Sequence, residues 1–112
     1  MPVSGARIRI KETVLEWPGV EAHAHRFQGG VEFRLGSREI GHVHGDQLVD
    51  IPFPTRVRQE VVAAGQARPH HVLPDSGWVS VYLRQPEDVE GAIALLRRSY
   101  QIASAQHARR KA

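Results

Sequence analysis

The sequence predicts one α+β domain in which a curved antiparallel sheet of about five to six strands packs on two to three helices. The segment 21–51 alternates apolar and polar residues in short runs between glycine turns, which is typical of an antiparallel meander. A later strand-like segment precedes a stretch with apolar residues at helical spacing. Because 112 residues form a single core, we expect one domain over 1–103 and a basic, disordered tail over 104–112.

The elements follow in order. In the segment 7–12, Ile8 and Ile10 alternate with charged residues, which fits either a strand or the start of a short helix. The meander is expected to contain four strands, 21–27, 31–35, 39–44 and 47–51, joined by turns at Gly29-Gly30, Gly36-Ser37 and Gly45-Asp46. In the second strand, Val31, Phe33 and Leu35 share one face, with Glu32 and Arg34 on the other.

The second half combines helices with one more strand. Pro52 and Pro54 end the meander, and a helix is expected with Thr55 as N-cap and Gly65 as C′ residue. The segment 66–77 reads as a loop, and 78–83 alternates as a fifth strand. A last helix begins at Pro86 and presents one apolar face to the sheet, formed by Val89, Ala92, Ile93, Leu96 and Tyr100.

Composition restricts the classes of function. The chain has no cysteine, which excludes disulfides, thiolate nucleophiles and cysteine-ligated zinc and fits a cytoplasmic protein. No continuous apolar run predicts a signal peptide or membrane span, so no membrane partner is expected. The net charge is +3, from 15 basic and 12 acidic residues. The arginines are spread along the chain, which favours an ordinary solvated surface, with nucleic-acid contact by the tail as an alternative.

Two histidines in the third strand are candidates for binding a ligand. Period two places His42 and His44 on one face, with their α-carbons roughly 6.5–7 Å apart. Two imidazoles could converge there on one ion, and zinc would need a third ligand from Asp46, His70 or His71. The alternative is that these histidines only hydrogen-bond across a half-exposed sheet, since the same spacing recurs at residues 23 and 25.

The loop before the fifth strand holds a second group of polar residues. His71, Asp75 and Ser76 include the residue types of a nucleophilic triad, but Asp-Ser-Gly-Trp is not the strained elbow of serine hydrolases. A turn stabilised by the aspartate and serine side chains is the simpler interpretation. Trp78 is expected to be a core or pocket-wall aromatic. The glycines match no nucleotide-binding motif.

Three blocks of the chain resemble the small bacterial luciferase-domain proteins: residues 39–46, residues 49–52 and residues 71–80. The resemblance covers about residues 25–103 and implies neither a light-producing reaction nor a flavin site. A more distant likeness, carried by Trp78 and Ser99-Tyr100, is to the MmcQ/YjbR proteins. That likeness implies their curved antiparallel sheet packed on helices, and DNA binding.

We therefore expect a small, non-enzymatic cytoplasmic binding or accessory protein whose partner is a small molecule or a protein. Its binding residues would line a pocket on the sheet: His42, His44, Asp46, His71, Asp75, Ser76 and Trp78. One alternative is a metal-dependent or acid–base enzyme using the same histidines, with zinc at His42 and His44. The other is a nucleic-acid-binding protein of the MmcQ/YjbR type. No cofactor is predicted from a motif.

Overall fold

The computed structural model describes residues 2–24 and 30–111 and has an α+β fold, as predicted. Its elements are, in chain order, α1 (Ala6–Val14), β1 (Val20–Ala24), β2 (Gly30–Leu35), β3 (Arg38–His44), β4 (Leu48–Pro52), α2 (Thr55–Ala63), β5 (Arg68–Pro69), β6 (Trp78–Tyr82) and α3 (Pro86–Lys111). The six strands form one sheet in the order β1-β2-β3-β4-β6-β5, and neighbouring strands are antiparallel.

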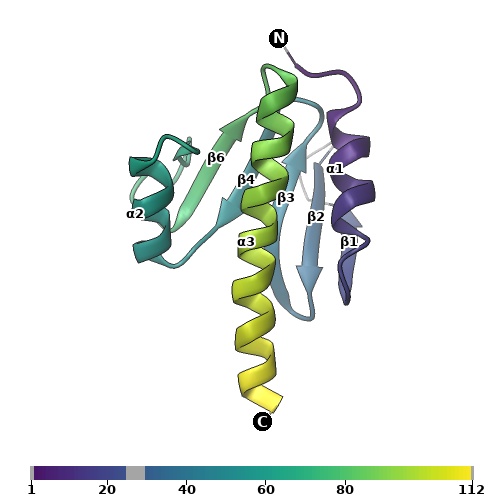
Figure 1. Cartoon of the computed structure of the whole chain (residues 1–112), viewed down its shortest axis with the longest axis vertical. Helices are drawn as coiled ribbons and strands as arrows, with labels where there is room; N and C mark the ends of the chain where they lie inside the picture. Colours follow the sequence, from purple (N-terminus) through teal and green to yellow (C-terminus); the bar gives the residue numbers. More distant parts are fainter. Residues whose placement is uncertain (1, 25–29, 112) are drawn as a thin grey trace.

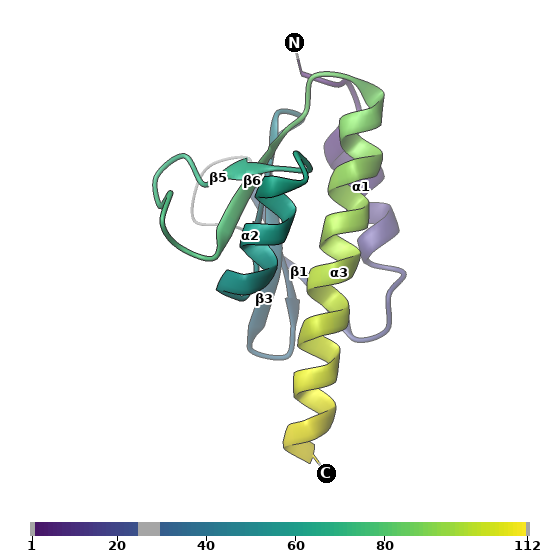
Figure 2. The same cartoon turned by 60° about the vertical axis from the view of Figure 1, so that its left-hand side comes forward.

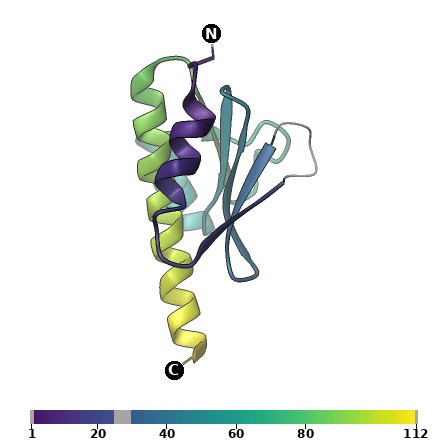
Figure 3. The same ribbon diagram turned by 90° about the vertical axis from the view of Figure 1, so that its right-hand side faces the viewer.

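The helices cover one face of the sheet and leave the other face for the site described below. The long helix α3 crosses the middle of the sheet, α1 lies beside it, and α2 packs against β6 at the other end (Figures 1 and 2). Seen edge-on, α1 and α3 lie on the same side of the strands (Figure 3). The core between these layers includes Phe33, Ile40, Val43, Val49, Ile51, Val79, Leu83 and Leu96, all almost inaccessible to solvent.

The first element is a helix because its buried residues recur every fourth position. Ala6, Ile10 and Val14 are buried, whereas Ile8 is exposed. The backbone N–H of Arg7, in the first turn, donates to Oδ1 of Asp46 at 2.9 Å. Asp46 therefore satisfies a free N–H at the start of α1. It does not belong to the histidine site for which the sequence suggested it.

The meander forms as predicted, with one irregularity that matters for the site. Phe33 is opposite Gly41 and Arg34 is opposite Glu39, so Ile40 is an extra residue in β3, a β-bulge. The predicted first strand, 21–27, is described only up to Ala24, and the predicted turn residue Gly29 lies outside the described residues. Gly36 adopts φ 64° between β2 and β3, where a turn was expected.

The segment between the meander and α3 departs from the prediction in two places. Thr55 is the first residue of α2, and the N-cap is Pro54, whose extended backbone (φ −56°, ψ 147°) leads into the helix. Gly65 ends the helix at φ 74°, as predicted. The expected loop 66–77 contains the short strand β5, which pairs with β6 and becomes the edge of the sheet.

The helix α3 is longer than expected. Asp88 accepts hydrogen bonds at its N-terminus from the backbone N–H groups of Arg84 and Gln85, at 2.9 and 3.0 Å. The helix continues to Lys111, so residues 104–111 are helical where a disordered tail was predicted. Extending a formed helix through alanine, glutamine and arginine costs little free energy, which explains the difference. Among the described residues, no helix is both long and apolar enough to span a membrane.

Candidate metal centre

The open face of the sheet has polar side chains at neighbouring positions of three central strands. His42 on β3 is the register partner of Asp50 on β4, and Asp50 is the partner of Ser80 on β6. All three are buried, and Asp50 is only 1% exposed. Their immediate neighbours along the strands, such as Val43 and Val49, face the helices because strand side chains alternate.

Four imidazoles converge on one carboxylate oxygen. Oδ2 of Asp50 lies 3.2 Å from Nε2 of His42 and 3.1 Å from Nε2 of His44. His70 and His71, which directly follow β5, bring their Nε2 atoms to 3.4 and 3.3 Å from the same oxygen. We call Asp50 and these four histidines the histidine cluster. The cluster joins β3, β4 and the loop after β5. His71 in that loop is 21 residues from Asp50 in the sequence.

Further polar groups hold the cluster in place. Oε2 of Glu39 lies 2.5 Å from Nδ1 of His42, on the side of the ring away from Asp50. The hydroxyl of Ser80 donates to Oδ1 of Asp50 at 2.6 Å, which leaves Oδ2 to the histidines. Glu39 can reach His42, three positions away, because the bulge at Ile40 brings both side chains to the same face.

Protonation of the metal-free cluster is strongly biased. Burial opposes a charge on His42, but hydrogen bonds to Asp50 and Glu39 outweigh it and raise the pKa of His42 to about 9. Burial also opposes ionisation of Asp50, yet the bonds from His42 and Ser80 and the other imidazoles hold the pKa of Asp50 below its ordinary value. Burial lowers the pKa of both His44 and His70. In the metal-free protein, a charged His42 thus faces the ionised carboxylate of Asp50.

The ligand atoms are spaced as around a metal ion. In two subsets, His42, His44 and Asp50, and Asp50, His70 and His71, the ligand atoms all lie within 4.8 Å of one another. Ligand atoms around a tetrahedral zinc ion, at bond lengths of about 2.0–2.1 Å, are roughly 3.3–3.4 Å apart. The separations of 3.1–3.3 Å between Asp50 Oδ2 and the imidazoles of His42, His44 and His71 match that value.

The cluster lies in an open cavity of about 1230 Å³ on the sheet face. The side chain of Trp78 forms one wall, with its ring centroid 5.2 Å from that of His42 and 6.0 Å from that of His70. Val72 and Leu73 line the cavity from the loop and are 68% and 50% exposed. Toward β1 and β2 the cavity is lined by polar residues: Glu21, His23, Glu32 and Arg34.

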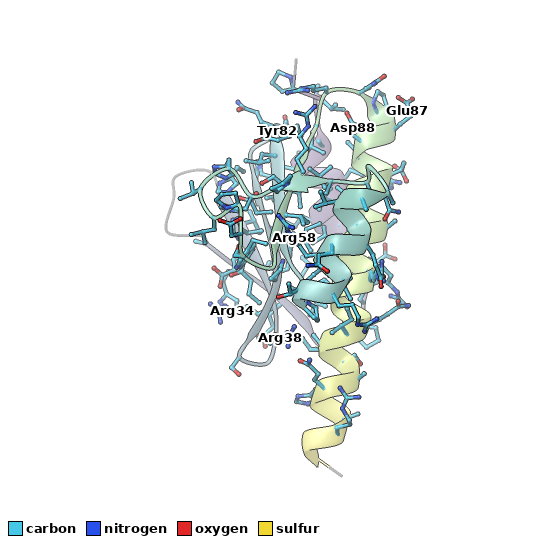
Figure 4. All side chains as sticks on the ribbon, turned by 90° about the vertical axis from the view of Figure 1, so that its left-hand side faces the viewer. Arg34, Arg38, Arg58, Tyr82, Glu87 and Asp88 are labelled. Atoms are coloured by element: carbon cyan, nitrogen blue, oxygen red, sulfur yellow. The ribbon has the colours of Figure 1, made fainter. Side chains whose placement is uncertain are left out.

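The loop that contributes His70 and His71 is tied to the sheet and to α2. Arg58 on α2, labelled in Figure 4, donates from Nη2 to the carbonyl oxygen of Pro74 at 2.6 Å. The N–H of Phe53 donates to the carbonyl of Gly77 at 3.0 Å, and a Cβ on Gly77 would collide with the carbonyl oxygen of Phe53. Glycine is therefore required there, because the loop passes too close to the end of β4 for a side chain.

The predicted pocket residues divide into two groups. His42, His44, His71 and Trp78 lie together around the cavity. Asp46, Asp75 and Ser76 do not line it. Ser76 instead accepts from the N–H of Trp78 at 3.1 Å and donates to the carbonyl of Leu73 at 2.7 Å, the turn that the sequence also allowed.

The sequence interpretation missed the central residue of the cluster. It assigned neither Asp50 nor Glu39 to the pocket, and it named His70 only as one possible third zinc ligand. One signal was available for Asp50: it is the only charged residue in the run Leu48–Pro52, between Val49 and Ile51. A carboxylate in the middle of an otherwise apolar strand needs a partner.

Comparisons with known proteins extend this description. The sequence model of the family described as Luciferase domain matches residues 37–99, which is more than half of the chain. The match includes every residue of the histidine cluster together with Glu39, Trp78 and Ser80. No curated protein and no solved structure matches the chain, and the relation to MmcQ/YjbR proteins stays a prediction. The chain belongs to the luciferase-domain family.

Proposed function

We propose that this luciferase-domain protein binds one divalent first-row transition metal ion on His42, His44 and Asp50 and presents it to small molecules in the cavity. The observation that carries the proposal is the convergence of four imidazole nitrogens on one buried carboxylate oxygen, at 3.1–3.4 Å. A single carboxylate could be satisfied by one or two donors. Four titratable rings gathered around one carboxylate oxygen are better explained by an ion that the oxygen and some of the rings bind together.

The surrounding hydrogen bonds support the same proposal. A histidine that ligates through Nε2 commonly donates its Nδ1–H to a carboxylate, and Glu39 is placed to accept that proton from His42. A ligating carboxylate is commonly held through its second oxygen, as Ser80 holds Oδ1 of Asp50. These contacts orient the two ligands before an ion binds, so less of the binding free energy is spent on ordering them.

The ligand types indicate which metals fit. Imidazole suits zinc, iron(II) and their first-row neighbours, and two histidines with one carboxylate leave coordination positions open. Structural zinc sites are closed by four protein ligands, whereas catalytic sites keep a position for water or substrate. An ion facing a cavity of about 1230 Å³ therefore favours a metal-dependent enzyme, one of the two alternatives to the expected non-enzymatic binding protein.

The nucleic-acid alternative has less support. Several arginines lie in ion pairs with carboxylates: Arg9 with Glu90, Arg34 with Glu32, and both Arg56 and Arg98 with Glu60. Such pairs reduce the positive charge that a phosphate backbone would meet. We therefore place the function at the metal site.

The test is metal binding by protein prepared without a histidine tag. After treatment with a chelator, calorimetric titration with zinc is expected to give one site per chain. Thermal unfolding is expected to show a higher melting temperature when zinc is present. His42→Ala should weaken zinc binding by about 100-fold or more, because the ion loses a pre-oriented ligand. The matched control His107→Ala removes an exposed histidine at the far end of α3 and should bind zinc as the unchanged protein does.

Circular dichroism of the metal-free variants separates loss of a ligand from loss of fold. If the unchanged protein binds none of zinc, cobalt(II), manganese(II) or iron(II) below a Kd of about 1 mM, the proposal is wrong. It is also wrong if folded His42→Ala and Asp50→Asn proteins bind zinc with unchanged affinity.

A further inference from the structure

The ring of His70 is held differently from that of His42. Its Nδ1 faces two backbone N–H groups, those of Val72 at 3.1 Å and Leu73 at 3.0 Å. Both groups can only donate, so Nδ1 of His70 must be the acceptor and carry no proton. The proton of the neutral ring is then on Nε2, the nitrogen that lies 3.4 Å from Oδ2 of Asp50.

This tautomer is the wrong one for a metal ligand. A metal ion binds the lone pair of an unprotonated Nε2, whereas Nε2 of His70 carries the proton of the neutral ring. His42 has the opposite arrangement, because its Nδ1 faces the carboxylate of Glu39 and a metal ion could replace the proton on its Nε2. For His70 to ligate, the ring would have to lose its last proton or give up both backbone hydrogen bonds. The chain therefore places the N–H donor of His70 beside the three proposed ligands, His42, His44 and Asp50.

Once an ion binds Asp50 Oδ2, that oxygen keeps only one lone pair for all the imidazoles around it, so the N–H of His70 gains from a second acceptor. The ring of His70 is mostly buried, with a side chain only 10% exposed, but it lines the cavity, so the acceptor has to come from whatever occupies the cavity beside the ion. An anionic oxygen bound to the metal would be a suitable one. The two residues that fix the ring, Val72 and Leu73, also present exposed apolar side chains to the cavity.

We propose that His70 does not ligate the metal but donates its Nε2–H to a carboxylate oxygen of a small ligand bound to the ion, whose apolar body lies against Val72 and Leu73. The proposal rests on the metal site proposed above and adds the class of ligand that it takes, a monocarboxylate with an apolar chain. Trp78, which lines the same cavity with its ring centroid 6.0 Å from that of His70, offers a further apolar surface for that chain.

The test uses His70→Asn. The asparagine oxygen can still accept from the N–H two residues on, as in an Asx turn, so the loop is kept while the Nε2–H is lost. Cobalt(II) is loaded as a coloured probe, and its absorption spectrum follows the addition of acetate or hexanoate. His70→Asn is expected to keep its cobalt affinity within about threefold and to bind hexanoate about tenfold or more weakly, as expected for loss of a hydrogen bond to a charged group.

Several outcomes would overturn the proposal. One is a folded His70→Asn protein that loses cobalt as strongly as His42→Ala does, since His70 would then be a ligand. Another is hexanoate binding to cobalt-loaded protein no more tightly than acetate does, or an unchanged hexanoate affinity in His70→Asn. If the unchanged protein binds no metal, the proposed function fails first, and that result is read from the titration without any carboxylate.

The tautomer itself is tested without metal. Long-range nitrogen–proton NMR spectra of the metal-free protein near pH 8 report which ring nitrogen of each histidine carries the proton. His70 is expected to show a protonated Nε2 and an unprotonated Nδ1. A protonated Nδ1 would remove the basis of the proposal even if the metal site exists.

Discussion

The metal-free protein should lose stability as the pH rises above neutral, because His42 is charged in the folded state. Its pKa is raised from 6.5 to about 9 by Asp50 and Glu39, against the effect of burial. A raised pKa means that the folded protein holds the proton more tightly than the unfolded chain does. The resulting stabilisation is fully present below about pH 6.5 and is lost as the pH rises through about 9.

The size of the loss follows from the shift. Each pKa unit corresponds to about 1.4 kcal/mol, so the charged His42 contributes about 3 kcal/mol at its maximum. His44 and His70, with lowered pKa values, act in the opposite sense. Their contribution to the free energy of unfolding stops changing with pH once these histidines are neutral in the unfolded chain, above about pH 7.5. Between pH 7.5 and 9.5 we therefore expect a net loss of about 2 kcal/mol from His42.

Urea denaturation followed by tryptophan fluorescence, in the presence of a chelator, measures this difference directly. His42→Gln should abolish most of the pH dependence in this window, whereas His107→Gln should keep it. Saturating zinc should also remove the loss, because the ion replaces the proton on His42. A chelated protein whose free energy of unfolding is flat from pH 7.5 to 9.5, or a folded His42→Gln variant with the same decline, would refute the reasoning.

Three further predictions concern the frame that supports the cluster. Gly41→Ala should destabilise the protein by about 1–3 kcal/mol, measured by urea denaturation, because the added Cβ collides with the side chain of Leu96. Tyr100→Phe should cost about 1 kcal/mol in the same assay, since the hydroxyl donates to the carbonyl of Pro18 at 2.7 Å, and no loss would contradict that bond. Ending the chain after Gln106 should change the free energy of unfolding by less than about 0.5 kcal/mol, because residues 107–109 are exposed. A larger loss would mean that the end of α3 packs on the domain.

The fold could be predicted where local patterns decide the structure. Alternation in β2, β3 and β6 and the apolar face of α3 follow from side-chain periodicity, which is a property of the local backbone. The segment around Ile8 and Ile10 was ambiguous because four residues of alternation are also compatible with a helix that buries every fourth residue. The strand β5 has only two residues, too few to leave a pattern.

The site depended on features that no local pattern contains. That His42 and His44 share a face follows from period two, and the structure has this arrangement. Glu39 lies an odd number of positions from His42, so strict alternation would place it on the opposite face. The bulge at Ile40 reverses this, and β-branched isoleucine gives no indication of a bulge. His70 and His71 reach Asp50 only because of the path of the loop after β5.

The position of Asp50 depended on the length of one turn. A two-residue turn at Gly45-Asp46 would pair His44 with Gln47 and His42 with Val49, which places Asp50 on the helix-facing side of the sheet. The structure pairs His44 with Leu48, so the turn has three residues, 45–47, and His42 is opposite Asp50. The side chain of Asp46 is engaged at the start of α1, which favours the longer turn. The choice of register, and with it the whole cluster, is therefore linked to a contact with a helix some 40 residues earlier in the chain, which strand patterns cannot reveal.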